Sequence, residues 1–145
     1  MKKFDFEEDY EYFDRLFDSL GGINKNIHLF DFRTPIIKRK EFNKIRNDIF
    51  YILMEKKGNI CELQLNENCT NNAEQVDHLI PLSSNDLNKE LRNIKGVNGK
   101  KTPTQSYGSN NTKNLILSCK KCNSFKKNHF PSNELLNKIF KSIIN

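Results

Sequence analysis

Four cysteines set in two pairs place the tightest constraint on how this chain of 145 residues can fold. Cys119 and Cys122 are separated by two residues, a spacing that lets two thiolates grip one zinc ion in tetrahedral geometry. Cys61 and Cys69 form a looser pair, with seven residues between them. The alternative to a shared metal site is four buried or unpaired thiols. We predict a structural zinc site made by all four cysteines, with no coordination position left open for water.

The length and the hydropathy of the chain indicate one compact domain away from membranes. A chain of 145 residues holds a modest core but is too short for two ordinary domains. No apolar run approaches the roughly 18 residues that span a bilayer, and the first residues turn acidic where a secretory signal becomes apolar. We therefore expect a cytoplasmic protein, either bacterial or phage-encoded, in which cysteines are metal ligands or free thiols more often than disulfides.

The net charge of +6 hides an uneven distribution of charged residues. Residues 1–31 carry eight acidic and four basic residues, a net of −4, which leaves +10 for the remainder of the chain. A basic body of this size suits a polyanionic partner, because each lysine or arginine near a phosphate releases condensed counterions. Composition alone leaves open whether this charge binds nucleic acid or forms a solvated surface.

Two amphipathic patterns predict helices within residues 1–57, which we interpret as a helical scaffold and a candidate recognition or dimerisation segment. Apolar residues recur at spacings of three and four from about Glu7 to Leu20, and a second such pattern follows Pro35 and ends near Gly58. A basic cluster opens the second helix and either touches a DNA backbone or forms a solvated face. It consists of Lys38, Arg39, Lys40, Lys44 and Arg46.

Residues 58–131 consist of short apolar stretches separated by asparagine-rich turns, which indicates strands and loops. A long polar loop, 85–111, contains LNKELRN, which predicts one or two helical turns, and loops of this length are usually functional or disordered. The segment NLILS is predicted to be a strand, and NSFKKNHF a short helix stopped by Pro131. Ser132 then caps an amphipathic helix within residues 132–145. The fold class that these elements predict is α+β.

The stretch QVDHLIPLSS at residues 75–84 sets an acid beside a histidine in an otherwise apolar run. Neighbouring side chains of a regular strand point to opposite faces. Asp77 and His78 can share one site only where the strand is interrupted or ends. Pro81, three residues further on, favours such an ending.

In chain order, DHLIP, NLILSCKKCN and the lysine pair that follows resemble the motif of the HNH nucleases, the ββα-metal family. In that family a histidine ends the first strand, an asparagine begins the second, and a histidine or asparagine lies on the next helix. His78, Asn114 and Asn123 occupy these places, which makes this an H-N-N variant. The resemblance covers about residues 58–130, and the long step from His78 to Asn114 implies an inserted loop. Paired cysteines flank the motif in many members, as Cys61, Cys69, Cys119 and Cys122 do here.

The resemblance implies a ββα-metal core stapled by the zinc site, in which Asp77 and Asn123 hold one catalytic metal. A carboxylate and an amide oxygen are hard ligands, which favours Mg²⁺ or Mn²⁺ over zinc at this position. His78 is the expected general base, because a neutral imidazole near its unperturbed pKa takes a proton from water at physiological pH. Asn114 is expected to bond across the loop and hold the backbone that aims His78.

Lysines near Asn123 supply candidate phosphate contacts. Lys126 and Lys127 follow Asn123 by three and four residues, so a helix would present all three on one face near its N-terminus. We assign Lys126 to the catalytic group, and Lys120, Lys121 and Lys127 to the nucleic-acid backbone.

These features predict a metal-dependent endonuclease that cuts double-stranded DNA and leaves a 3′-hydroxyl and a 5′-phosphate. A restriction enzyme or a nuclease of a phage or mobile element fits this description, and a homodimer is the assembly that concerted double-strand cleavage needs. The alternative is a non-catalytic, zinc-stapled DNA- or RNA-binding module, which shares the cysteines and the charge. Such a module has no chemical need for Asp77 with His78 and Asn123, which favours the enzyme.

Overall fold

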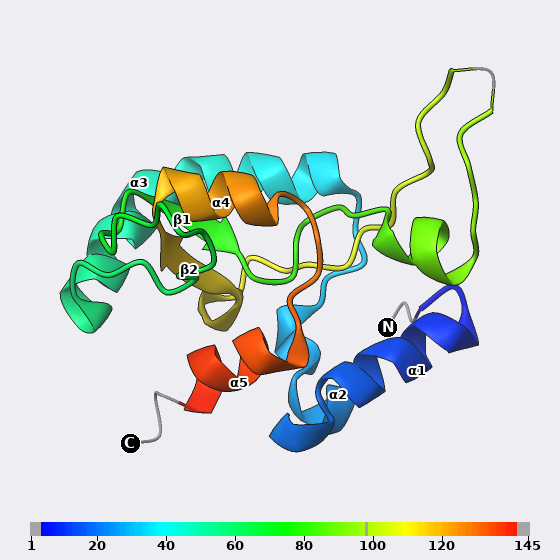
Figure 1. The fold of residues 1–145 in the computed structure, drawn as a ribbon, viewed down its shortest axis with the longest axis horizontal. Helices are drawn as coiled ribbons and strands as arrows, with labels where there is room; N and C mark the ends of the chain where they lie inside the picture. The colour runs from blue at the N-terminus through cyan, green and yellow to red at the C-terminus, as the bar shows by residue number, and fades with distance from the viewer. Residues whose placement is uncertain (1–3, 98, 142–145) are drawn as a thin grey trace.

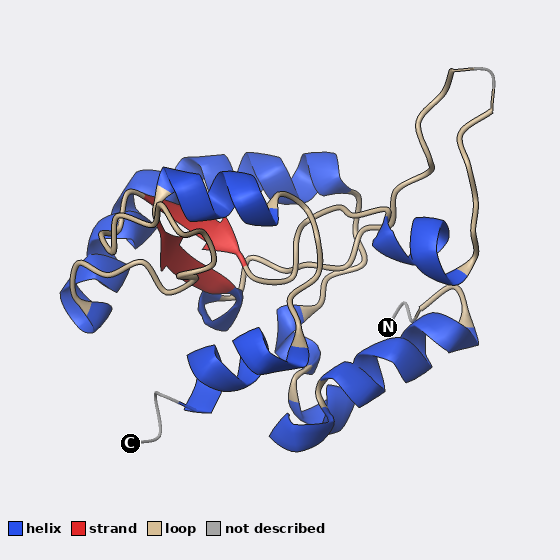
Figure 2. Cartoon of the chain, in the orientation of Figure 1, coloured by secondary structure: helices blue, strands red, loops and turns tan. Residues whose placement is uncertain are grey.

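The computed structural model describes residues 4–97 and 99–141 as helices joined to one small sheet (Figures 1 and 2). The helices are α1 (Glu7–Leu16), α2 (Gly22–Lys25), α3 (Pro35–Lys57), α4 (Lys120–Lys126) and α5 (Asn133–Lys141), and the strands are β1 (Gln75–His78) and β2 (Leu115–Ser118). Short helical turns are η1 (Asp18–Leu20), η2 (Ile27–Leu29), η3 (Leu87–Leu91) and η4 (Thr112–Asn114). The fold class is therefore α+β, as predicted. None of the helices in the described part of the chain combines the length and apolar character that a bilayer crossing requires.

The sheet is an antiparallel pair of strands, and β2 is buried on both of its faces. Asp77 pairs with Ile116 and His78 with Leu115, and β1 ends at His78, as the sequence indicated. Because side chains alternate along a strand, Leu115 and Leu117 pack in one core and Ile116 in the other. The four-residue strand thus joins the two hydrophobic clusters of the molecule.

Helix α3 covers one face of the sheet. Pro35 is its first residue, where the missing N–H costs nothing, and Gly58 ends it at a φ of 86°. Phe42, Ile49 and Leu53 pack with Leu115 and Leu117 in the smaller cluster. In Figure 1, α3 runs along the upper side of the sheet with α4 beside it. The two helices beside the sheet therefore come from distant parts of the chain.

The larger cluster packs the N-terminal region, α5 and the second face of β2 together. Its buried side chains include Phe13, Phe17, Leu79, Ile80, Tyr107, Ile116 and Leu136. Helix α1 ends at Leu16, four residues before the predicted end at Leu20, and the short turn η1 follows. The chain is thereby redirected into α2 and η2.

Asp9, buried on α1, anchors the long loop of residues 85–111. Its carboxylate accepts hydrogen bonds from Tyr107 Oη and from Gln105 Nε2, and it pairs with the Arg92 guanidinium. The predicted helical turn is present as η3, and between this turn and Gln105 a hairpin-shaped segment projects from the body (Figure 1). The N-terminal region thus holds the base of the inserted loop.

Helix α4 differs from the prediction in its bounds. It begins at Lys120, inside the cysteine knuckle, because Cys119 Sγ accepts the backbone N–H of Cys122 and so caps its first turn. It ends at Lys126, and Lys127 adopts a φ of +53° beyond it. The expected helical face shared by Asn123, Lys126 and Lys127 is therefore not formed. The end of the predicted terminal helix, residues 142–145, lies outside the described residues.

Candidate functional site

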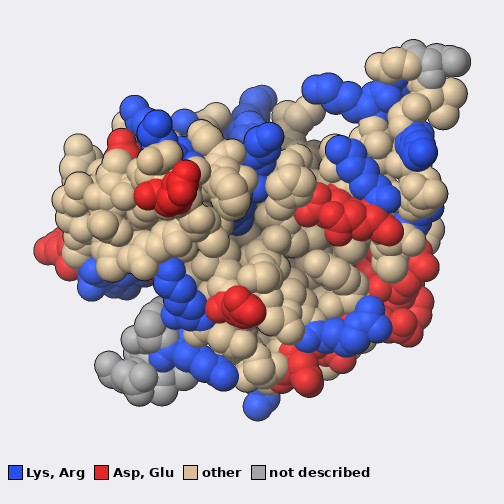
Figure 3. Space-filling view, viewed as in Figure 1, with Lys and Arg blue, Asp and Glu red and all other residues tan. Residues whose placement is uncertain are grey.

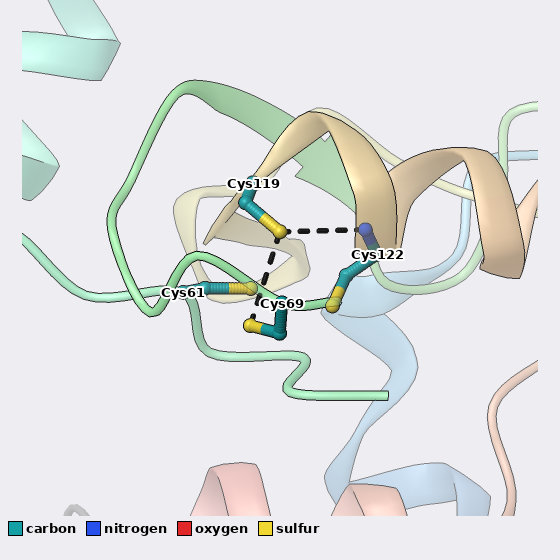
Figure 4. A group of neighbouring side chains, drawn as sticks. All are labelled: Cys61, Cys69, Cys119 and Cys122. Carbon is teal, nitrogen blue, oxygen red and sulfur yellow. Dashed lines mark hydrogen bonds between the residues drawn. The ribbon is translucent and has the colours of Figure 1, made fainter. Parts of the chain in front are cut away.

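Cys61, Cys69, Cys119 and Cys122 form one cluster whose four Sγ atoms lie within 4.8 Å of one another. Figure 4 shows the first two arriving from the loop before β1 and the other two from the start of α4. The Sγ atoms of Cys69 and Cys119 are 3.8 Å apart. Sulfurs at the corners of a tetrahedral zinc site, with bonds of about 2.3 Å, also lie about 3.8 Å apart. The cluster can therefore bind a metal such as zinc.

Backbone N–H groups point at the sulfurs of this cluster. Leu65 and Asn66 donate to Cys122 Sγ at 3.3 and 3.4 Å, and Asn71 donates to Cys69 Sγ at 3.4 Å. Such donors stabilise negative charge on sulfur and orient the ligands of a metal. The backbone of the loop before β1 therefore adopts a conformation that stabilises thiolates at Cys69 and Cys122.

The pKa values of the clustered thiols move in opposite directions. Burial raises the pKa of Cys69 to about 12. Burial also opposes ionisation of Cys119, but N–H donors from Cys122 and Thr70 outweigh it and lower the pKa of Cys119 to about 6. Thiolates this close repel one another unless a cation balances their charge. The cluster thus favours a metal ion over four free thiolates.

A pocket of about 370 Å³ lies beside the end of β1. Asp77 and His78 line it from β1 and Asn123 lines it from α4, so the structure brings these three predicted site residues together. Asp77 Oδ1 accepts the backbone N–H of His78 at 2.9 Å, which turns the carboxylate back toward its neighbour. The opposite wall comes from α3 and consists of Arg39, Phe42, Arg46, Asn47, Phe50 and Tyr51.

The Asn123 amide reaches the Asp77 carboxylate across the pocket. One terminal atom of the amide lies 3.2 Å from both Oδ1 and Oδ2 of Asp77. With its nitrogen in that place the amide donates to both oxygens, and its own oxygen accepts from Gln75 Nε2. Turned over, the same amide points its oxygen at the carboxylate, an all-oxygen donor set that needs a cation between the two acceptors. That donor set is the kind that Mg²⁺ and Mn²⁺ prefer.

Lys126 lies under this pair and is not exposed to a ligand, contrary to its predicted place on an open helix face. Its Nζ lies 3.5 Å from Asp77 Oδ2 and donates to the His78 carbonyl oxygen at 3.0 Å, with 3% of the side chain exposed. Burial raises the pKa of Asp77 and lowers that of Lys126, and each charge opposes the shift of the other. Lys126 therefore balances the Asp77 charge and ties α4 to the end of β1.

The His78 imidazole is buried between α3 and the loop before β2. The Phe42 ring meets it edge to face at 4.5 Å between centroids, and its Nε2 lies 2.7 Å from Asn110 Oδ1. Burial, followed by the nearby positive charges of Lys126, Arg39 and Lys38, lowers the pKa of His78 to about 4. The expectation of a pKa near the unperturbed value is therefore wrong, and the ring is neutral throughout the physiological range.

Asn114 makes hydrogen bonds across the loop, as its predicted role requires. Its Oδ1 accepts from the Ile80 backbone N–H at 2.8 Å, and its Nδ2 donates to the carbonyls of Ile80 and Ser109 at 3.0 and 2.8 Å. The side chain is fully buried. Asn114 thus holds the backbone two residues beyond His78 against the loop that carries Asn110.

The three lysines predicted to contact the nucleic-acid backbone line a separate hollow on the outer side of α4. Lys120, Lys121 and Lys127 surround it together with Asn66, Ser124 and Phe125.

Lys38 differs from the rest of its predicted basic cluster, because it is buried and donates to the Asp31 and Gly108 carbonyls at 2.7 and 2.6 Å. Figure 3 shows basic side chains along the upper edge of the molecule, over α3 and the projecting loop.

Sequence reasoning missed Asn110 and gave Arg39 and Phe42 no role in the pocket. Asn110 lies in an asparagine-rich loop 32 residues from His78, and nothing in the sequence distinguishes it from its neighbours. Arg39, Phe42 and Arg46 recur at three and four residues, and this helical spacing was the available signal. His129 bonds Asp86 at 2.8 Å and does not line the pocket.

Comparison with known proteins identifies no matching family model, no matching curated protein and no matching solved structure.

Proposed function

We propose that the protein is a metal-dependent DNA endonuclease of the HNH type, with its site in the pocket at the end of β1. The observation that carries this proposal is the convergence of Asp77, His78 and Asn123 from β1 and α4 on one pocket. A carboxylate and an amide oxygen can hold a divalent cation, and a neutral imidazole can accept a proton from water, so the three groups suit hydrolysis of a phosphodiester. The resemblance to the ββα-metal family rests on these residues and on the β1, β2, α4 order.

Asp77 and Asn123 would hold one Mg²⁺ or Mn²⁺ ion, which neutralises charge on the scissile phosphate and on the leaving oxygen when bound. The buried His78 ring stays neutral, so it can accept a proton from the attacking water. Arg39 and Arg46 on the α3 wall are placed to attract a phosphate into the pocket. Lys126 contacts both the Asp77 carboxylate and the His78 carbonyl oxygen, and so holds the Asp77 side chain in place relative to the His78 backbone.

We assign the four-cysteine cluster to a structural zinc ion. Four thiolates leave no coordination position open for water, so this site does not activate a nucleophile. It instead ties the loop before β1 to the start of α4, and α4 carries Asn123. The zinc site therefore positions one wall of the proposed active site.

The decisive experiment incubates the purified protein with supercoiled plasmid in the presence of Mg²⁺ or Mn²⁺. We expect nicked or linear product from the wild type, a loss of cleavage in His78→Ala, and unchanged cleavage in His129→Ala, whose side chain is 55% exposed and outside the pocket. Equal cleavage by His78→Ala would show a contaminant or a wrong base. If the wild type binds DNA but leaves all substrates intact across both metals, the non-catalytic binding module is the better description.

A further inference from the structure

The side chain of Asn110 lies between the Lys38 carbonyl and the His78 ring. Its Nδ2 donates to the Lys38 carbonyl oxygen at 2.8 Å, and its Oδ1 lies 2.7 Å from His78 Nε2. A carbonyl oxygen only accepts hydrogen bonds, so the amide nitrogen must face Lys38 and the amide oxygen must face His78. The orientation of this amide is therefore fixed by the backbone of α3.

An acceptor beside Nε2 determines which ring nitrogen carries the proton. Because Asn110 Oδ1 can only accept, the 2.7 Å contact requires a hydrogen on Nε2. A neutral imidazole has one N–H, so Nδ1 then carries the lone pair. No described residue hydrogen-bonds to Nδ1, and His78 lines the pocket with Asp77 and Asn123.

We propose that Asn110 is a positioning residue that holds His78 in the Nε2–H tautomer and leaves Nδ1 as the nitrogen that accepts the proton of the attacking water. The role in water activation rests on the proposed function, whereas the tautomer follows from the Lys38, Asn110 and His78 contacts alone. The chain of contacts runs from the α3 backbone through the amide to the ring.

The loop that carries Asn110 is held on both sides, so the amide is fixed before a substrate arrives. Lys38 Nζ donates to the Gly108 carbonyl, and Asn114 Nδ2 donates to the Ser109 carbonyl. Gly108 packs so closely that an added Cβ would lie 2.0 Å from the Ile80 carbonyl oxygen. A side chain at position 108 would therefore displace the backbone next to Asn110.

The test reads the tautomer by two-bond ¹⁵N–¹H NMR correlations of the histidine rings, without added divalent metal, beside plasmid cleavage. We expect Nε2–H in the wild type. Asn110→Leu should populate the Nδ1–H tautomer and lower the turnover rate about 100-fold or more, with little change in KM. The neighbouring Asn111→Ala should leave the His78 signals and the turnover unchanged.

An Nδ1–H tautomer in the wild type would overturn the proposal, as would Asn110→Leu with wild-type NMR signals and a wild-type rate. If Asn110→Leu does not fold, the wild-type spectrum decides the point, because an Nδ1–H tautomer there contradicts the contact scheme. A wild type that shows Nε2–H but cuts no DNA keeps the tautomer assignment and rejects the proposed function. The two failures are thus distinguishable.

The hollow on the outer side of α4 supports a second, independent inference. It measures about 710 Å³ and has the Phe125 ring, 59% exposed, among Lys120, Lys121 and Lys127. Phe125 follows Asn123 by two residues, or about 200° around the helix, so it faces away from the pocket. A large exposed ring surrounded by three lysines differs from an ordinary solvated basic face.

We infer that this hollow binds a single-stranded nucleic-acid segment, with one base stacked on Phe125 and its phosphates on the lysines. Stacking on an aromatic side chain requires a free base face, which a base inside a duplex does not offer. The lysines match the charge of the backbone. The hollow would therefore hold an unpaired segment or strand end.

The chain contains no tryptophan, so Phe125→Trp introduces a single fluorescent reporter at the proposed stacking position. We expect oligo(dT) to quench this fluorescence, and a duplex of equal charge to quench it little at the same salt concentration. Phe125→Ala should weaken oligo(dT) binding about tenfold and leave duplex binding unchanged. Equal quenching by both DNAs, or unchanged oligo(dT) affinity in Phe125→Ala, would overturn the inference. An oligo(U) titration separates RNA from DNA as the preferred strand.

Discussion

Asn114 holds Ile80 by both of its backbone polar groups, accepting its N–H at 2.8 Å and donating to its carbonyl at 3.0 Å. A side chain thus takes the part that a neighbouring strand would play, just after β1 has ended at His78. Because the same amide also donates to the Ser109 carbonyl, β1 and the Asn110 loop are fixed relative to each other. The relative position of β1 and the Asn110 loop at the pocket therefore depends on the buried amide of Asn114.

Asn114→Ala is expected to lower the free energy of unfolding by about 3 kcal/mol. The change leaves the Ile80 N–H, the Ile80 carbonyl and the Ser109 carbonyl without partners in a buried place, and each unsatisfied group costs about 1 to 3 kcal/mol before relaxation. Urea unfolding followed by circular dichroism measures the effect. Asn72→Ala, at an exposed position, should stay within about 0.5 kcal/mol of wild type. Two equally stable variants would contradict the structural role of Asn114.

The sequence predicted the features of the site that depend on local pattern. The end of β1 at His78, the strand NLILS and the cysteine clustering each follow from spacing and residue type. The bounds of α4 were wrong because a sulfur cap begins this helix inside the knuckle, which no periodicity reveals. The burial of Lys38 and the place of Asn110 depend on contacts between distant segments. Contacts of this kind produce no recognisable pattern in the local sequence of a polar loop.

The cysteine cluster is expected to contain one zinc ion per chain and to be required for stability. Purified protein should show stoichiometric zinc by elemental analysis, and Cys69→Ser or removal by a strong chelator should lower the thermal midpoint markedly, because metal binding is coupled to folding. Asn68→Ala, exposed in the same loop, should keep its zinc. Protein purified without chelators that lacks zinc and is still fully stable would exclude this site.

Substitutions of Asp77 and Lys126 are expected to have non-additive effects on stability. The second substitution is not expected to restore the cleavage that Asp77→Asn abolishes. Asp77→Asn leaves the buried Lys126 ammonium without its counter-charge, and Lys126→Met leaves the carboxylate unpaired, so each should cost about 1 to 4 kcal/mol. The double variant should be destabilised by less than the sum of the two, because neither buried charge remains. Cleavage should be lost in both variants that carry Asp77→Asn. Restored cleavage in the double variant would exclude Asp77 as a metal ligand.

The buried Lys38 is expected to make stability rise with pH in the alkaline range. Burial lowers its pKa from 10.5 to about 8 in the folded chain, with Asp31 opposing the shift. Between these two values the unfolded chain binds the proton and the folded chain does not, so the free energy of unfolding increases as the pH rises through this window. The amine keeps two N–H donors after it loses the proton, so its bonds to Asp31 and Gly108 can persist.

Lys38→Met isolates this contribution. At pH 7 it should lower the free energy of unfolding by about 1 to 3 kcal/mol, because two buried carbonyl groups lose their donor. The difference between wild type and variant should then grow by about 1 to 3 kcal/mol between pH 8 and pH 10.5. Lys40→Met, exposed on the same helix, should follow the wild-type curve. A constant difference across this range would show that Lys38 titrates at its ordinary pKa and would contradict this prediction.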